Sequence, residues 1–253
     1  AARERDVLSR YRHPHIIRLH AVARRDGEHC LVYELGALGS LAEHLLYDAK
    51  AAELTWVRRA RGALGLASAL NFMYRSGELP VFHRDVKSAN IVLADGFVAK
   101  LIDCGTSQFV KEDVAAAGAG TVFAASTGFA GFGTPGYMCP SFCQTRMFGE
   151  KSELFSLGIV LAELLTGKLQ MQDGVNIYDD YEDEEDDLRE ALDTRPGACP
   201  APIADALVAL VLDCLKKHKK RPPMEDVLGR LRALVAEHCQ PTAAELRQTE
   251  EAA

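Results

Sequence analysis

The order of apolar and polar positions predicts a small mixed segment at the start of the chain. Apolar residues on one face predict a helix over residues 3–12, and His13-Pro14 ends it because the residue before a proline avoids helical backbone. Two β-type runs follow at 16–23 and 30–34, joined by a polar turn at Asp26-Gly27. A helix followed by a two-stranded hairpin is therefore expected here.

Helical spacing dominates the rest of the chain. Ser40 is expected to cap a helix over 41–46, and Gly167 is expected to end a helix over 156–166. Three longer helices are expected at 56–76, 203–217 and 224–237. Short apolar strands are expected at 81–82, 91–93 and 98–102.

Two stretches carry no such periodicity. Residues 105–136 are rich in alanine, glycine, serine and threonine, which predicts a mobile segment. Residues 239–253 are expected to form a polar tail. The whole pattern predicts an α+β fold in which helices outweigh strands.

Composition and charge argue against a membrane span in this sequence and against a nucleic-acid-binding protein. The 253 residues suffice for one large or two small domains, and no apolar run reaches the roughly 18 residues of a membrane span. The net charge is −7, yet residues 173–193 alone hold eleven acids and one base, so the remainder is about +3. Nothing in this pattern indicates nucleic-acid binding. The acidic segment 173–193 is interpreted as a solvated insertion loop, and the alternative is that it binds a basic regulatory partner.

Cysteine usage indicates the compartment. The seven cysteines are scattered, and the one close pair, Cys139 and Cys143, has no histidine nearby at zinc-site spacing. Reduced thiols in a cytoplasmic protein are therefore expected.

The residues that carry chemistry lie in the middle of the chain. The sequence His-Arg-Asp-Val-Lys-Ser-Ala-Asn occupies 83–90, and Asp103-Cys104-Gly105 follows between apolar runs. These stretches resemble the catalytic loop and the metal-binding loop of eukaryotic protein kinases. Further matches at 8–14, 31–34, 39–41, 133–137, 156–167 and 221–224 make the chain similar to the Pelle, plant receptor-like and interleukin-receptor-associated kinase group.

The resemblance implies roles for the residues of both loops. Asp85 would be the catalytic base that accepts the substrate hydroxyl proton, and Lys87 would neutralise charge on the transferred phosphoryl group. Arg84 would pair with a phosphorylated residue of the 105–136 segment. The sequence does not choose among the candidates for this phosphorylation site, which are Thr106, Ser107, Thr121, Ser126, Thr127 and Thr134. Asn90 and Asp103 would bind Mg²⁺ through oxygen atoms.

The resemblance also implies a nucleotide pocket for ATP. Tyr33 would lie at the back of the adenine site, Glu34 and Gly36 would offer backbone groups to adenine, and Val92 would form the apolar floor. Glu4 matches the helix glutamate that pairs with a strand lysine in this family. That lysine and the Gly-rich loop have no counterpart in this sequence, because no lysine precedes Lys50.

Three further positions depart from the family pattern. Cys104 stands where the family has phenylalanine, and Ser141 stands where it has a glutamate that pairs with an arginine, here Arg221. Glu153 replaces the aspartate that braces the catalytic loop, and its extra methylene is expected to displace that loop by about an ångström.

The resemblance therefore implies a two-lobed kinase fold with a truncated small lobe. Residues 1–35 would be the remnant of the small lobe, 36–238 the large lobe and 239–253 the tail. The expected function is that of a serine/threonine protein kinase that uses ATP and Mg²⁺ on protein substrates. The chain by itself is expected to bind ATP poorly. The alternative is a pseudokinase that serves as a binding or scaffold module. A cytoplasmic location is expected, either free or as the cytoplasmic domain of a membrane receptor.

Overall fold

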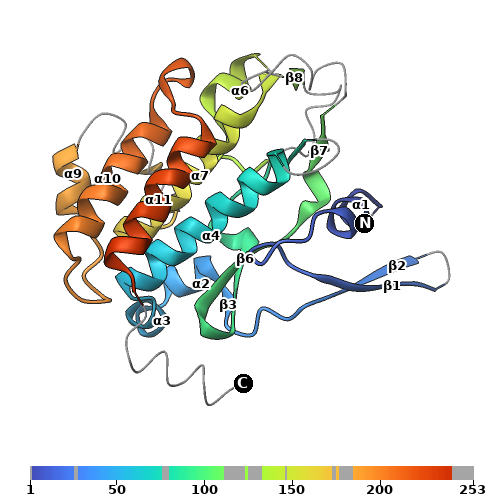
Figure 1. Cartoon of the computed structure of the whole chain (residues 1–253), viewed down its shortest axis with the longest axis horizontal. Coiled ribbons are helices and arrows are strands. Elements are labelled where there is room, and N and C mark those ends of the chain that lie inside the picture. Colours follow the sequence, from blue (N-terminus) through green and yellow to red (C-terminus); the bar gives the residue numbers. More distant parts are fainter. Residues whose placement is uncertain are drawn as a thin grey trace.

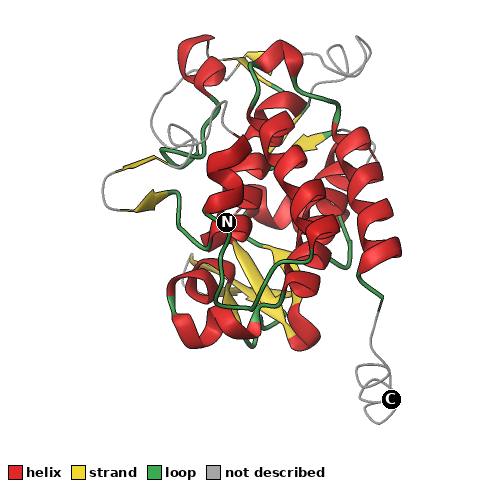
Figure 2. Ribbon diagram, turned by 90° about the vertical axis from the view of Figure 1, so that its left-hand side faces the viewer, coloured by secondary structure: helices red, strands yellow, loops and turns green. Residues whose placement is uncertain are grey.

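The computed structural model describes residues 2–25, 28–75, 80–110, 123–124, 133–145, 147–172, 175–176 and 185–240. Most of the expected mobile segment, residues 173–174 and 177–184 of the acidic segment and the tail beyond Gln240 lie outside these residues. Within the described residues, helices form the bulk of the molecule and the strands are short, as Figure 2 shows. The expected α+β class with a mainly helical larger part is confirmed. The boundaries expected between the lobes stay a prediction.

The first part of the chain forms one helix and one hairpin. Helix α1 spans Ala2–Arg10, and strands β1 (Leu19–Arg25) and β2 (Glu28–Tyr33) pair antiparallel. In Figure 1 this hairpin extends away from the helices.

The hairpin begins later than the pattern predicts, because residues 16 and 17 have other partners. Ile16 forms an isolated bridge with Leu101, and the Ile17 amide donates to the Leu101 carbonyl at 2.9 Å. This pairing ties the start of the hairpin to the larger part of the molecule. Helix α1 also ends two residues earlier than expected, at Arg10.

A three-stranded sheet joins the two parts. Strands β3 (Gly39–Ser40), β5 (Ile91–Ala94) and β6 (Val98–Leu101) lie side by side in that order. Helix α2 (Leu41–Leu46) follows β3, and the expected cap is confirmed, since the Ser40 hydroxyl accepts from the Glu43 amide at 3.2 Å. Helix α3 (Asp48–Glu53) comes next and was not predicted.

Four long helices build the core. These are α4 (Trp56–Arg75), α7 (Glu150–Thr166), α10 (Ala201–Leu215) and α11 (Met224–His238), with α7 in contact with the other three. Every residue of α7 except Lys151 is buried, so this helix lies at the centre of the core. It begins six residues earlier than predicted, and its end at Gly167, with φ +68°, agrees with the predicted left-handed cap.

Short elements complete the described part. They are β4 (Val81–Phe82) with β7 (Gln108–Phe109), β8 (Phe123–Ala124) with β9 (Met147–Phe148), β10 (Met171–Gln172) with β11 (Val175–Asn176), the helices α6 (Pro140–Thr145) and α9 (Glu185–Glu190), and the 3-10 turns η1 (Ser88–Asn90), η2 (Asp95–Phe97), η3 (Cys104–Thr106) and η4 (His218–Lys220). Among the described residues, no helix combines the length and the apolar character that crossing a bilayer requires.

Candidate active site

The 83–90 loop runs between β4 and β5, and its first residue is fixed in the core. His83 is fully buried, and its Nδ1 accepts from the Asp85 amide at 3.3 Å while Nε2 lies 3.0 Å from the Ile102 carbonyl. An Nδ1 that accepts leaves the proton on Nε2, so Nε2 donates to Ile102. Burial lowers the pKa of His83, which keeps the ring neutral.

Glu153 on α7 holds the same loop from the other side. Its two carboxylate oxygens accept the backbone amides of His83 at 3.1 Å and Arg84 at 2.7 Å. Arg84 has a φ of 72°, an uncommon conformation that these two hydrogen bonds stabilise. Burial raises the pKa of Glu153 to about 7, against the opposing effect of the two amides. The longer side chain of glutamate thus still reaches both amides.

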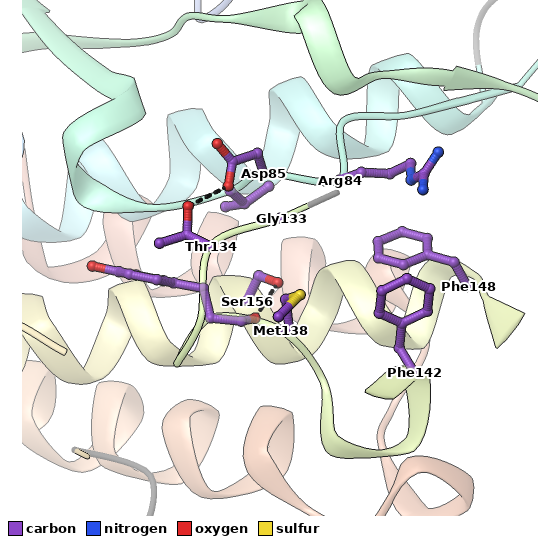
Figure 3. A pocket seen from close by; sticks show the side chains of 10 residues that line it. Arg84, Asp85, Gly133, Thr134, Met138, Phe142, Phe148 and Ser156 are labelled. Carbon is purple, nitrogen blue, oxygen red and sulfur yellow. Dashed lines mark hydrogen bonds between the residues drawn. The ribbon is translucent and has the colours of Figure 1, made fainter. Parts of the chain in front are cut away.

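Asp85 is the centre of a hydrogen-bond cluster. Its Oδ2 accepts from Lys87 Nζ at 2.8 Å and from Asn90 Nδ2 at 2.9 Å, and its Oδ1 accepts from the Thr134 hydroxyl at 2.7 Å, the bond drawn in Figure 3. Burial alone would raise the pKa of Asp85, but Lys87, Thr134 and Asn90 together lower it. The carboxylate is therefore ionised at neutral pH.

Thr134 is a site residue that the sequence interpretation missed, having treated it only as a candidate phosphorylation site. Its hydroxyl donates to Asp85 and accepts from Lys87 Nζ at 2.7 Å, which closes a triangle of three side chains. Gly133 places it there: φ is +84°, and a Cβ at that position would lie 2.9 Å from Met138 and 3.2 Å from the Arg84 carbonyl. The glycine before the threonine was the signal available in the sequence.

The two expected metal ligands are Asn90 and Asp103. Both bonds formed by the Asn90 side chain come from Nδ2, to the Asp85 carbonyl and carboxylate, so Oδ1 makes no hydrogen bond within the described residues. Asp103 has left-handed backbone (φ 59°, ψ 64°), and its exposed carboxylate accepts from the Gly105 amide at 3.2 Å. The described residues contain no group of three or more His, Cys, Asp or Glu side chains that could hold a metal ion. A cation bound by Asn90 and Asp103 would need further ligands from a substrate.

The residues expected around a nucleotide form two contacts. The Tyr33 hydroxyl donates to Glu4 at 2.6 Å, which places the α1 glutamate against the end of β2. Burial and the adjacent Glu4 carboxylate raise the pKa of Tyr33. Gly36 packs directly on Val92, since a Cβ at position 36 would lie 2.6 Å from the Val92 Cβ. The Glu34 carboxylate pairs with Lys100 at 2.9 Å, and the role expected for the Glu34 backbone stays a prediction.

Arg84 points away from Asp85, as Figure 3 shows. Its guanidinium donates to Gln108 at 3.1 Å and lies 5.8 Å from the centre of the Phe148 ring. The pairing expected with a phosphorylated residue stays a prediction. Thr106 donates to the His83 carbonyl at 3.0 Å, and Ser107 is fully buried. The other candidate phosphorylation sites, Thr121, Ser126 and Thr127, lie outside the described residues.

The departures from the family pattern have local explanations. Cys104 is fully buried, and burial raises the pKa of its thiol to about 12, so it is a neutral apolar filler. Arg221, which would have paired with a glutamate at position 141, donates instead to Cys139 Sγ at 2.9 Å and to the Lys151 carbonyl at 2.8 Å.

Comparisons with known proteins agree with this geometry. Residues 1–230 match the protein kinase domain family. The U-box domain-containing protein 52 of Arabidopsis thaliana is 33% identical over 234 residues, covering 90% of this chain and 27% of that protein. The receptor-like protein kinase ANXUR2 of the same plant is 36% identical over 165 residues, covering 65% of this chain and 18% of that protein. The U-box domain-containing protein 70 of Oryza sativa subsp. japonica is 35% identical over 233 residues, covering 92% of this chain and 28% of that protein.

Proposed function

Because the chain belongs to the protein kinase domain family, we propose that it transfers the γ-phosphoryl group of ATP to serine or threonine hydroxyls of proteins. The observation that carries this proposal is the triangle of Asp85, Lys87 and Thr134, with all three separations between 2.7 and 2.8 Å. A compact carboxylate, ammonium and hydroxyl arrangement suits a small aliphatic alcohol as the acceptor.

Asp85 acts on the acceptor hydroxyl. One carboxylate oxygen accepts the hydrogen bond of that hydroxyl and takes its proton as the oxygen attacks phosphorus. Its lowered pKa keeps the carboxylate in the ionised form that this role requires. Lys87 lies within reach of the same point and neutralises negative charge on the transferred group. Thr134 orients both side chains.

The donor end of the reaction uses residues on either side of this triangle. Asn90 Oδ1 and the Asp103 carboxylate would hold Mg²⁺ together with phosphate oxygens, and both groups fit because each presents an oxygen atom that a hard cation prefers. A bound Mg²⁺ supplies charge neutralisation for the phosphates. Gly36 and Val92 would face adenine, and Tyr33 would close the back of that site.

The curated relatives are much longer than this chain. The chain spans 18% of the length of ANXUR2, 27% of that of the U-box domain-containing protein 52 and 29% of that of the wall-associated receptor kinase-like 10 of Arabidopsis thaliana. Some of those relatives are named as receptor-like kinases and others as U-box domain-containing proteins. We therefore propose a cytoplasmic kinase domain within a larger protein, with protein substrates.

The test is phosphoryl transfer from labelled ATP and Mg²⁺ to a generic serine- and threonine-containing protein, by the longest translated product that contains this chain. We expect phosphoserine or phosphothreonine to form, and Asp85→Asn to lower the rate by at least about 10²-fold, since general-base removal costs that much. Asp85→Asn keeps the shape and the bond to Thr134, so loss of rate without loss of stability supports a chemical role.

A second candidate is a pseudokinase that binds partners without transferring phosphate. The small buried Cys104 favours it, because this side chain packs less surface than the larger apolar group expected there. Absence of transfer and of Mg²⁺-dependent ATP binding in the product that contains this chain would contradict the kinase proposal and favour this second function.

A further inference from the structure

Charge is distributed unequally between two ends of the molecule. Residues 2–25, which form α1 and β1, contain seven arginines and two acids, Glu4 and Asp6, a net charge of +5 with histidines neutral. The run 179–187 contains eight acids and Tyr181, with no base. That run leads into α9, and Figure 1 shows α9 and α1 at opposite ends of the molecule. One end of each chain is therefore basic and the other acidic.

The basic end contains a groove of about 710 Å³. Its floor is apolar and includes Leu8 and Ile17, while its rim includes Arg12, Arg18 and the exposed His20. The side chains of Arg12 and Arg18 are exposed and make no hydrogen bond or ion pair within the described residues. Two exposed guanidinium groups beside an apolar floor suit an acidic peptide that also carries an aromatic side chain.

The groove lies on the opposite side of the β2 end from the candidate nucleotide site. Tyr33 directs its hydroxyl to Glu4, whereas the next residue, Glu34, directs its carboxylate to Lys100 and the Arg18 amide on the groove side. Neighbouring side chains of an extended segment point to opposite faces. A ligand in the groove would therefore leave the Asp85 cluster accessible.

We propose that the acidic run 179–187 of a second copy of this chain docks in this groove. The groove and the run are complementary in charge, and Tyr181 gives the run an aromatic side chain for the apolar floor. Since the groove is partly lined by α1 and the run leads into α9, at the opposite end of the molecule, the contact joins different surfaces of two copies and is heterologous. Such contacts produce head-to-tail chains, and a charged interface of this kind weakens as salt rises.

The test is sedimentation velocity of the full chain at several micromolar concentrations, in low salt and in about 0.5 M salt, where the Debye length is a few ångströms. We expect the average mass to rise with concentration in low salt and to return to that of a monomer in high salt. Arg12→Glu with Arg18→Glu should weaken association at least about tenfold, because each exposed like-charge contact opposes docking. The matched control is Arg24→Glu with Arg25→Glu on β1, which changes the net charge of the chain by the same amount but lies outside the groove.

A mixing experiment separates docking from general charge attraction. A second variant replaces the acids of 179–184 with their amides, and it should be monomeric alone, as should the groove variant. In a mixture of the two, the acidic run of the groove variant can dock in the intact groove of the amide variant. The other groove and the other run are altered, so no third copy can bind and the mixture should form only a dimer. A chain that stays monomeric in low salt, an equal loss in the Arg24/Arg25 control, or a mixture that stays monomeric would each overturn the proposal. The proposal does not depend on phosphoryl transfer, so the two tests fail independently.

Discussion

Helix α7 and the β1–β2 hairpin are both connected to the candidate active site, but they are packed very differently. All residues of α7 except Lys151 are buried, and it reaches the site through Glu153. Six of the seven residues of β1 are exposed, and the hairpin contacts the site through the hydrogen bond from Tyr33 to Glu4. The 83–90 loop is thus held by a helix that is buried almost throughout, while the proposed nucleotide side rests on a largely exposed hairpin.

This difference indicates a division of roles. A fully buried helix with fixed side chains holds the 83–90 loop in one geometry, which chemistry between small groups requires. An exposed hairpin has few apolar contacts and opens locally at low free-energy cost. We expect positions on α7 to control stability and geometry together, and positions on the hairpin to change mainly local order.

The largest expected effect comes from Phe155 at the centre of α7. Its side chain is 1% exposed, and the Arg221 guanidinium lies over the Phe155 ring, 4.9 Å from the ring centre. Phe155→Ala should lower the free energy of unfolding by about 3–5 kcal/mol, because it removes buried apolar surface and leaves a cavity. Chemical denaturation measures this value, and Phe155→Leu is the matched control, with a loss below about 2 kcal/mol. Equal losses in the two variants would contradict the close packing of α7.

The second effect is a dependence of stability on pH that arises from Glu163, also on α7. This fully buried carboxyl accepts from Tyr137 at 2.5 Å and from the Gln170 amide at 2.8 Å, and burial raises its pKa to about 7. The folded state therefore holds a proton that the unfolded state, with a pKa near 4.5, releases. Stability contributed by this group is present below about pH 4.5 and is lost as the pH rises towards 7.

Glu163→Gln isolates that contribution. Glutamine keeps the acceptor for Tyr137 and cannot ionise, so the variant should lose less stability than the parent chain between about pH 5 and pH 8, with a difference of up to a few kcal/mol. Thermal unfolding across this pH range measures it. Glu153 has a pKa raised to a similar value and is present in both proteins, so its effect cancels in the comparison. Parallel pH profiles would show that Glu163 is ionised without cost in the folded chain.

Much of this comparison could be predicted from the sequence, because the features concerned depend on residues that are close together along the chain. The cap at Ser40 and the stop at Gly167 follow from single residue types, and both were placed correctly. The match of 83–90 and 103–105 to family motifs gave the family. Asp85, Lys87 and Asn90 are then brought together by a loop of only a few residues, so their neighbourhood needed no tertiary knowledge.

The parts that could not be predicted depend on contacts between distant segments. The first turn of α7 contains Glu150, which looks like a surface residue but is buried and accepts from the Met224 amide at 2.8 Å. Thr134 joins Asp85 across 49 positions, a contact that no periodicity contains. The late start of β1 likewise follows from pairing with Leu101, and not from the local pattern.

A smaller effect is expected where the start of α7 is tied to the chain before α6. Arg221 donates to Cys139 Sγ and to the Lys151 carbonyl, and its Nε is buried without a hydrogen-bond partner within the described residues. Cys139→Ala should cost about 1–3 kcal/mol, because it leaves another donor of a buried cation unsatisfied. Cys139→Ser keeps an acceptor and should cost less. Denaturation midpoints of the two variants measure the difference, and an equal loss would assign the cost to packing alone.

The smallest effect, on the hairpin, tests the comparison most directly, because the same substitution can be made in both regions. Val32 on β2 is 49% exposed and Val160 on α7 is fully buried. Valine and threonine are nearly equal in shape, so the exchange chiefly adds a hydroxyl. Val160→Thr should cost about 1–3 kcal/mol, since a buried hydroxyl must lose its water. Val32→Thr should stay within about 0.5 kcal/mol, because its hydroxyl remains hydrated. Native-state hydrogen exchange gives a second measurement of the same contrast. The amides of β1 and β2 should exchange through local opening, so Val160→Thr should leave their exchange rates unchanged. The amides of α7 should exchange only through global unfolding, so their exchange rates should rise as Val160→Thr lowers the free energy of unfolding. Hairpin amides that slow or quicken in step with α7 would show one cooperative unit and remove the contrast between the two regions.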